Sequence, residues 1–241
     1  MIEIAPDAAG LAGRAATRIV ATARHAIAER GRCVMFLSGG NTPRATYARL
    51  ATSEFAGQVD WSRVHFAFGD ERCVAFHDPR NTFRMVYDVL TSRIGIPDAN
   101  VHAIPVDRPP AEAALAYELT LRTLLGTTQP DLVLLGLGED GHTASLFPGH
   151  AAIREQVRWV VAEEIAAQVT WRVTVTPLLF NTAREVVFLV SGASKADILR
   201  SVLEPPCDPD TLPAQAIRPI SGRLDWLVDR AAAGRPSLPR A

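Results

Sequence analysis

Apolar residues recur at helical spacing near the start of the chain and then gather in short continuous runs. Between residues 7 and 30, the apolar positions lie three or four residues apart, which predicts an amphipathic helix that ends at Gly31. The continuous runs have the length of strands, and several lack polar alternation, as is typical of strands buried on both faces. They are Cys33–Leu37, Val64–Phe68, Leu132–Leu135, Trp159–Val161 and Val186–Val190.

Segments with helical patterns separate these runs. They cover residues 43–51, 82–93, 110–125 and 194–203, so that strands and helices alternate through most of the chain. Such alternation predicts an α/β protein with a largely parallel sheet. The proline-rich pieces at 105–110 and 205–213 are short, and neither a repeat nor a long linker interrupts the pattern. We therefore expect a single domain over residues 1–241.

Composition and charge exclude several classes of protein. The chain carries 25 Lys and Arg against 26 Asp and Glu, without a long basic run, so we expect no nucleic-acid partner. No apolar run approaches the roughly 18 residues that span a bilayer, and the N-terminus lacks a secretion leader, so we expect no membrane segment and a cytoplasmic location. Cys33, Cys73 and Cys207 are widely spaced and odd in number, which indicates reduced, mostly structural thiols and no metal site.

Four loops follow predicted strands, at the sheet edge where open α/β sheets bind ligands. They are residues 38–43, 69–81, 136–149 and 191–195. In the first, Gly39 and Gly40 let the backbone approach a ligand. Thr42 is the expected N-cap and Pro43 the first helical residue, so that free N–H groups favour an anion there. The alternative is a plain tight turn.

The second and fourth loops carry cations. Asp70, Glu71 and Arg72 share one rim, where Arg72 is suited to a bidentate contact with phosphate, although a surface ion pair would look the same. Asn81 is explained as a helix cap alone. Lys195 lies in a first helical turn, where a lysine opposes the helix dipole, which favours a ligand-binding role over a solvated lysine. Arg172, in a strand-like segment, is a further candidate.

The third loop holds two competing patterns. Residues 136–141 spell G-x-G-x-x-G after a strand, as in dinucleotide-binding proteins, but Pro148 and Gly149 leave too short a helix for a pyrophosphate. Asp140 and His142 form the second pattern. A carboxylate near a histidine fixes the tautomer and orientation of the imidazole, which then abstracts a proton from water or from a substrate carbon. We interpret His142 as the proton-handling group and the other five histidines as structural or surface residues.

Taken together, these motifs resemble the 6-phosphogluconolactonase family. The segments SGGNTP, GDERCV, LGLGEDGHTASLFPG, WRVTVTP and FLVSGASKADIL occur in the family's order and spacing, from Met35 to about Trp226. The resemblance implies a doubly wound α/β fold with helices on both faces, shared with glucosamine-6-phosphate isomerase/deaminase enzymes. It also implies hydrolysis of 6-phospho-D-glucono-1,5-lactone to 6-phospho-D-gluconate in the oxidative pentose phosphate pathway, without metal or organic cofactor.

The resemblance also implies roles for individual residues. The catalytic histidine corresponds to His142 and its neighbouring acid to Asp140. The substrate and phosphate contacts fall on the following residues: Gly39, Gly40, Thr42, Asp70, Arg72, Arg172 and Lys195. Two positions depart from the family's pattern, because Arg80 and Asn41 stand where many members have serine.

Two other functions stay open. The deaminase relatives usually carry a glutamate five residues after their histidine, where this chain has Phe147, which favours the lactonase. A non-catalytic sugar-phosphate sensor fused to a DNA-binding module would need a basic helical module, which the chain lacks. For the lactonase, we expect His142 to activate water, and a phosphorylated sugar lactone to be the partner. The oligomeric state is not fixed by the sequence, and a monomer is compatible with it.

Overall fold

The computed structural model describes residues 1–234, so the last seven residues of the expected domain lie outside the described part. The helices are α1 (Ala8–Arg30), α2 (Asn41–Leu50), α3 (Ser53–Ala56), α4 (Thr82–Val86), α5 (Pro110–Leu125), α6 (Pro177–Phe180), α7 (Ala196–Leu203) and α8 (Arg230–Ala233). The strands are β1 (Ile2–Ala5), β2 (Cys33–Leu37), β3 (Val64–Phe68), β4 (Asp70–Arg72), β5 (Val101–His102), β6 (Leu132–Leu135), β7 (Val160–Ile165), β8 (Thr170–Val175), β9 (Glu185–Val190) and β10 (Arg223–Asp229).

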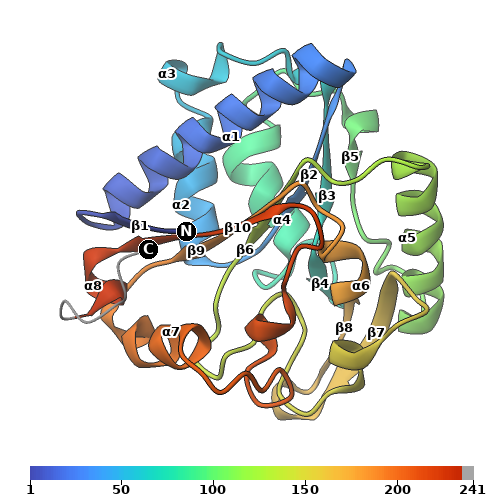
Figure 1. Ribbon diagram of the computed structural model, residues 1–241. Coiled ribbons are helices and arrows are strands. Elements are labelled where there is room, and N and C mark those ends of the chain that lie inside the picture. Colours follow the sequence, from blue (N-terminus) through green and yellow to red (C-terminus); the bar gives the residue numbers. More distant parts are fainter. Residues whose placement is uncertain (235–241) are drawn as a thin grey trace.

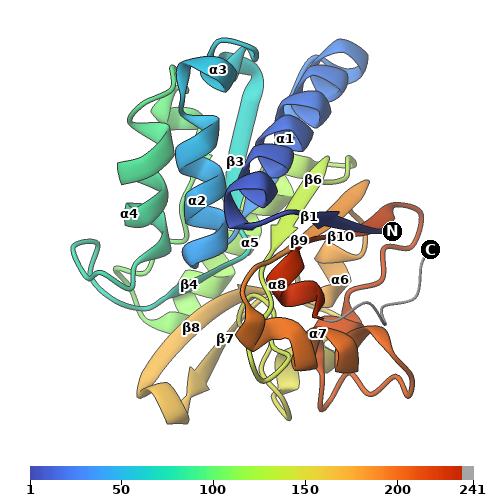
Figure 2. The same cartoon turned by 90° about the vertical axis from the view of Figure 1, so that its left-hand side faces the viewer.

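Seven strands form one parallel sheet in the order β1-β10-β9-β6-β2-β3-β5. All side chains of β2, β6 and β9 are buried, which explains the apolar sequences of β2 and β6 and of β9 after Glu185. On one side of the sheet lie α1, α2 and α4, and on the other lie α5 and α6 (Figure 1; Figure 2). The expected α/β architecture, with a largely parallel sheet and helices on both faces, is confirmed.

Helix α1 shows how local sequence produces this packing. The Asp7 side chain accepts a hydrogen bond from the Gly10 N–H at 2.7 Å and caps the start of the helix, and Gly31 ends it with a φ of 76°. Its apolar stripe, which runs from Leu11 to Ala26, is buried in the core. Alanine fills much of this stripe, so that α1 lies close to the sheet.

The connections reverse direction between two neighbouring strands. From β2 the chain moves toward β3, whereas from β6 it moves the opposite way, toward β9. Met35 of β2 nevertheless pairs directly with Leu132 of β6. The loops after these two strands therefore diverge to opposite faces and open a crevice at the carboxyl end of the sheet, where α/β proteins bind ligands.

Three local predictions are wrong. The run Trp159–Val161 does not join the parallel sheet, because β7 pairs antiparallel with β8 in a separate sheet of order β4-β8-β7. Residues 70–72, expected in a loop, form β4 of that sheet. Thr42 is not an N-cap, since α2 begins at Asn41 and its cap is Gly40, whose φ of 104° lets the chain turn into the helix earlier.

Other local predictions are confirmed, and Asn81 caps α4 by accepting a hydrogen bond from the Arg84 N–H at 2.7 Å. Beyond α4, a π-helical turn continues the predicted helix over Tyr87–Thr91. Within residues 1–234, no helix is long and apolar enough to span a membrane.

Candidate functional site

A cavity of about 440 Å³ opens at the crevice between the loops that follow β2 and β6. Residues of all four predicted loops line it, as does Arg172 of β8. The structure thus brings together nearly all of the predicted site residues: Gly39, Gly40, Thr42, Asp70, Arg72, His142, Arg172 and Lys195. Asp140, the remaining one, lies behind His142 and contacts its ring.

His142 is held on two sides by its own loop. Its ring Nδ1 forms a hydrogen bond with Oδ1 of Asp140, and its backbone N–H donates to the same oxygen at 3.1 Å. Partial burial disfavours the Asp140 carboxylate, but attraction to the His142 ring and hydrogen bonds from His142 outweigh it, and the pKa of Asp140 lies below its usual value. A charged acceptor at Nδ1 leaves Nε2 as the ring atom that can take up a proton.

Gly138 lies directly against the side chains of Asp140 and His142. Its N–H donates to the carbonyl oxygen of His142 at 2.8 Å, which closes the loop on itself. A Cβ at position 138 would overlap the His142 ring and would lie 2.6 Å from Oδ1 of Asp140. The glycine therefore permits the close approach of backbone and imidazole, and it serves the histidine geometry instead of a pyrophosphate.

Phe147 covers another face of the imidazole. The two rings stack with centroids 4.3 Å apart and planes inclined by 29°. The guanidinium carbon of Arg172 lies 5.2 Å from the centroid of the Phe147 ring. Phe147 thus contacts both the imidazole and the guanidinium, and its stacking limits the rotation of the histidine.

A buried polar network fixes Arg172. Ser145 Oγ donates to Oδ2 of Asp70 at 2.5 Å, and Nη1 of Arg172 lies 3.5 Å from the same Asp70 oxygen. Burial lowers the pKa of Arg172, which Asp70 partly offsets, yet a guanidinium keeps its charge in proteins. Nε of Arg172 is buried and has no hydrogen-bond partner within the described chain. Asp70 therefore faces the cavity as part of this network.

Arg72 reaches the cavity from β4. Its Nη1 donates to Thr82 Oγ1 at 3.1 Å and to the Arg80 carbonyl oxygen at 3.2 Å, both neutral acceptors. Glu71, its neighbour, is buried and accepts hydrogen bonds from the N–H groups of Arg72, Thr82 and Phe83. Glu71 therefore fixes the loop through backbone N–H groups, and the Arg72 guanidinium forms no ion pair with residues 1–234. Its charge is free to meet an anion.

The Gly39–Gly40 loop presents backbone donors to the same cavity. The N–H groups of Gly39 and Gly40 have no acceptor in the described part of the chain. Tyr47 of α2 supports the loop from below, since its hydroxyl accepts from the Ser38 N–H and donates to the Ser38 carbonyl oxygen, both at 3.0 Å. Free N–H groups at a helix start are suited to bind a phosphate or an oxyanion.

Lys195 closes the cavity on the side of β9. Its side chain is 22% exposed, and its Nζ lies 3.8 Å from Oε1 of Glu139, a mostly exposed residue. Asp229 holds the loop before it, accepting hydrogen bonds from the Ser191 hydroxyl at 2.5 Å and the Gly192 N–H at 3.1 Å. These contacts fix the backbone of the loop. The ammonium group of Lys195 itself is held only by its weak ion pair with Glu139 among the described residues.

Metal-binding groups are not concentrated here. Among residues 1–234, no three His, Cys, Asp or Glu side chains come together as a candidate metal site. The polar groups of the cavity are instead mostly hydrogen-bond donors: guanidinium groups, an ammonium group and backbone N–H groups. This set is suited to an anionic ligand beside one imidazole.

Comparison with known proteins matches residues 6–226 to the model of the glucosamine-6-phosphate isomerase/6-phosphogluconolactonase family. The chain belongs to this family. A relative named 6-phosphogluconolactonase from Synechocystis is 41% identical over 213 residues, which are 86% of this chain and 86% of the relative. The crystal structure of 6-phosphogluconolactonase from Thermotoga maritima is 31% identical, with a TM-score of 0.82 over 95% of this chain and 99% of that one.

A solved structure that is named for another activity has the same fold. The structure of a monomeric glucosamine-6-phosphate deaminase covers 96% of this chain and 98% of its own, with a TM-score of 0.80 at 23% identity. At that identity the likeness shows the fold alone. The fold alone therefore does not distinguish the two activities for this chain.

Several residues that support the cavity were not predicted from the sequence. They are Tyr47, which holds the glycine loop, Ser145, which bridges Asp70 and Arg172, and Thr174, whose hydroxyl accepts from the Ser145 N–H at 3.2 Å. All three are buried. The only sequence signal was their polar character at otherwise apolar or loop positions, which by itself names no partner.

Proposed function

We propose that the chain hydrolyses 6-phospho-D-glucono-1,5-lactone to 6-phospho-D-gluconate, a step of the oxidative pentose phosphate pathway, with His142 as general base. One observation carries the proposal: an imidazole held by Asp140 borders a cavity that Arg72, Arg172 and Lys195 also line. The relatives named 6-phosphogluconolactonase support the same activity. Three free thiols support the expected cytoplasmic location.

In the proposed mechanism, His142 Nε2 takes a proton from a water molecule that attacks C1 of the lactone. Asp140 stabilises the imidazolium that forms and keeps Nδ1 protonated. A tetrahedral oxyanion develops at C1, and backbone N–H groups of the glycine-rich loops are the proposed donors. The imidazolium then returns its proton to the ring oxygen as the bond between C1 and that oxygen breaks, which opens the ring.

The cations hold the 6-phosphate at a distance from this chemistry. Arg72, Lys195 and the Gly39–Gly40 N–H groups are the proposed direct contacts, with Thr42 and Arg172 beside them. Asp70 has a carboxylate, which repels phosphate, so we assign it the positioning of Arg172 through their 3.5 Å ion pair. Binding the remote phosphate orients the ring over His142.

The test is a rapid assay on freshly generated 6-phosphogluconolactone, corrected for spontaneous hydrolysis. The protein should accelerate opening far above the buffer rate, and H142N should lower kcat by about 100- to 10,000-fold, the usual contribution of a placed general base. Equal thermal unfolding midpoints would show that H142N keeps the fold. A parallel assay measures ammonia from glucosamine 6-phosphate. Ammonia release without lactone hydrolysis, or an H142N variant of near-normal rate, would overturn the proposal.

A further inference from the structure

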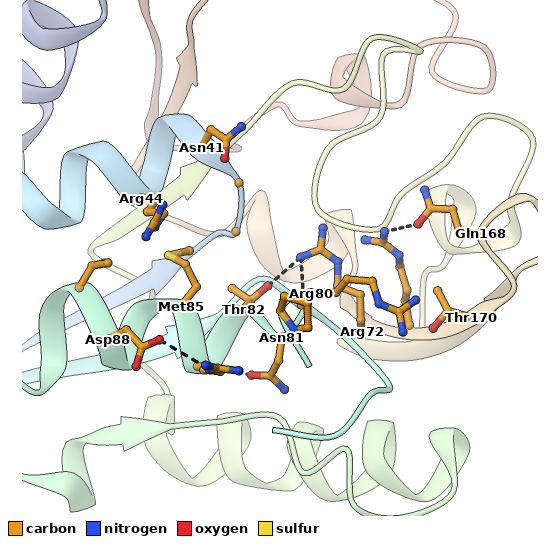
Figure 3. Close-up of a pocket in the computed structure, with 16 residues that line it drawn as sticks. Asn41, Arg44, Arg72, Arg80, Asn81, Thr82, Met85, Asp88, Gln168 and Thr170 are labelled. Carbon is orange, nitrogen blue, oxygen red and sulfur yellow. Dashed lines mark hydrogen bonds and ion pairs between the residues drawn. The ribbon is translucent and has the colours of Figure 1, made fainter. Parts of the chain in front are cut away.

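A second cavity, of about 650 Å³, lies beside the one that holds His142. It is enclosed by the start of α2, the loop before α4, α4 itself and the tip of the β7–β8 hairpin (Figure 3). The two cavities share Gly39, Gly40, Asn41, Arg72 and Arg172, but neither His142 nor Lys195 lines the second one. We call this second cavity the arginine chamber.

Positive charge dominates the arginine chamber. One carboxylate, Asp88, lines it together with five arginines: Arg44, Arg72, Arg80, Arg84 and Arg172. Three of the five have an acidic partner in the described chain, because Arg80 pairs with Asp78, Arg84 with Asp88 and Arg172 with Asp70. Arg44 and Arg72 have none. The chamber therefore has an excess of two guanidinium charges in one concave space, which favours an anion of charge minus two.

Arg44, Arg80 and Arg84 are the arginines that line the chamber but not the lactone site. Arg44 is exposed on α2, and its side chain makes no hydrogen bond or ion pair with residues 1–234. Arg80 lies on the loop before α4, where Asp78 holds it at 2.7 Å. Together, Arg44 and Arg80 place positive charge on two sides of the chamber.

The neutral groups of the chamber narrow the class of ligand. No aromatic side chain of residues 1–234 lines it, so a nucleobase would find no ring of the described chain to stack on. Asn41, Gln168 and Thr170 supply amides and a hydroxyl that suit the hydroxyl groups of a sugar. We propose that the arginine chamber is a second binding site, which takes a non-aromatic phosphate monoester such as a sugar phosphate, separately from the lactone site.

The arginine chamber affects the lactone site through Arg72, which lines both cavities. An anion in the chamber draws this guanidinium away from the phosphate of a ligand beside His142, so that occupancy of one site weakens binding to the other. Binding in the chamber does not depend on the proposed lactonase activity, since it involves no proton transfer and no contact with His142.

Equilibrium dialysis with inorganic phosphate at low ionic strength tests the proposal on the full chain. The wild-type protein should bind two equivalents, and R44A/R80S should lose one, with at least a tenfold weaker affinity at the affected site. K195A should lose the other equivalent. The matched control is R24A/R63S, which removes two exposed positive charges outside the chamber and should still bind two.

A competition experiment then identifies the ligand class. In K195A, glucose 6-phosphate should displace the remaining phosphate, whereas adenosine monophosphate should compete no better than phosphate itself. R44A/R80S should keep the wild-type kcat in the lactone assay, which separates failure of this proposal from failure of the proposed function. Unchanged phosphate binding in R44A/R80S, loss of both equivalents in K195A, or displacement by adenosine monophosphate alone would overturn it.

Discussion

Two glycines of the loop after β6 differ in what surrounds them, although the sequence presents them as equivalent. A Cβ at Gly138 would overlap the His142 ring, whereas a Cβ at Gly136 would meet no atom within 4 Å. Neither residue has a φ in the left-handed region. The loop therefore needs glycine at 138 for proximity to the imidazole, and at 136 for no reason that the described residues show.

This difference predicts the effect of a single methyl group. G138A should displace the imidazole by an ångström or so and lower kcat by about 100-fold, since misplacing a catalytic group by that distance has such an effect. G136A is the matched control and should keep kcat close to the wild-type value. Thermal unfolding should show that both variants are folded. Similar kcat values for the two variants would contradict the proposed role of His142.

At the scale of elements, the strands and helices whose sequences alone determine their burial were predicted correctly. The apolar runs of β2, β6 and β9 bury their side chains inside a sheet, and the apolar stripe of the capped helix α1 is buried by packing against a sheet. Because the carboxyl ends of parallel strands share an edge, the four loops and their charged residues could be placed together. Most residues of the candidate site could therefore be predicted from the sequence alone.

Contacts between segments that are distant in the chain could not be predicted from the sequence. The run Trp159–Val161 is as apolar as a central strand, but its partner β8 turns back at once and forms an antiparallel hairpin. Strand β4 has three residues and exists because β8 pairs with it. Likewise, Ser145 and Tyr47 act through partners that come close only in the fold, Asp70 across 75 positions and the Ser38 backbone across nine.

The edge of the sheet contains a pH-sensitive pair. His65 of β3 and His102 of β5 stack with ring centroids 5.4 Å apart, and Nδ1 of His65 lies 3.1 Å from Nε2 of His102. Burial lowers the pKa of His65, and the charge of Arg32 adds to this effect. Burial also lowers the pKa of His102, with a contribution from His65. The folded chain therefore binds protons at both sites more weakly than the unfolded chain does.

The sign of the pH effect follows from this difference. As the pH falls through the unfolded value of about 6.5, protons bind preferentially to the unfolded chain, so the free energy of unfolding decreases until the folded values are passed. Urea unfolding at pH 7.5, 6.5 and 5.5 should show a smaller decrease for H65Q/H102Q than for the wild type. Between pH 7.5 and 8.5, where both rings are neutral, the two proteins should differ by a constant amount. Parallel curves down to pH 5.5 would contradict the assignment.

The whole molecule is nearly neutral, with a formal net charge of minus one, but its charges are unevenly distributed. Six cationic side chains of residues 1–234 line the two adjoining cavities at the carboxyl end of the sheet: Arg44, Arg72, Arg80, Arg84, Arg172 and Lys195. Only three carboxylates of the described chain line the same cavities, those of Asp70, Asp88 and Glu139. A concave surface with an excess of positive charge attracts anionic ligands over distances comparable to the Debye length, about 10 Å at 0.1 M salt. A phosphorylated substrate should be guided to this face, and an uncharged one should not.

This distribution predicts how salt affects the reaction. Raising the ionic strength from about 0.02 M to 0.2 M shortens the Debye length roughly threefold, so kcat/KM for 6-phosphogluconolactone should fall severalfold, mainly through KM. The control substrate is D-glucono-1,5-lactone, which lacks the phosphate, so its kcat/KM should show almost no salt dependence. A salt ion bound at His142, or a loss of structure at high salt, would lower kcat/KM for both lactones, whereas screening would affect only the phosphorylated one. R44A/R80S should reduce the slope for the phosphorylated substrate, because these two charges contribute to the attraction while standing outside the lactone site. Equal salt slopes for the two lactones would mean that the positive face does not steer the substrate, and that the phosphate is recognised only after it has entered the cavity.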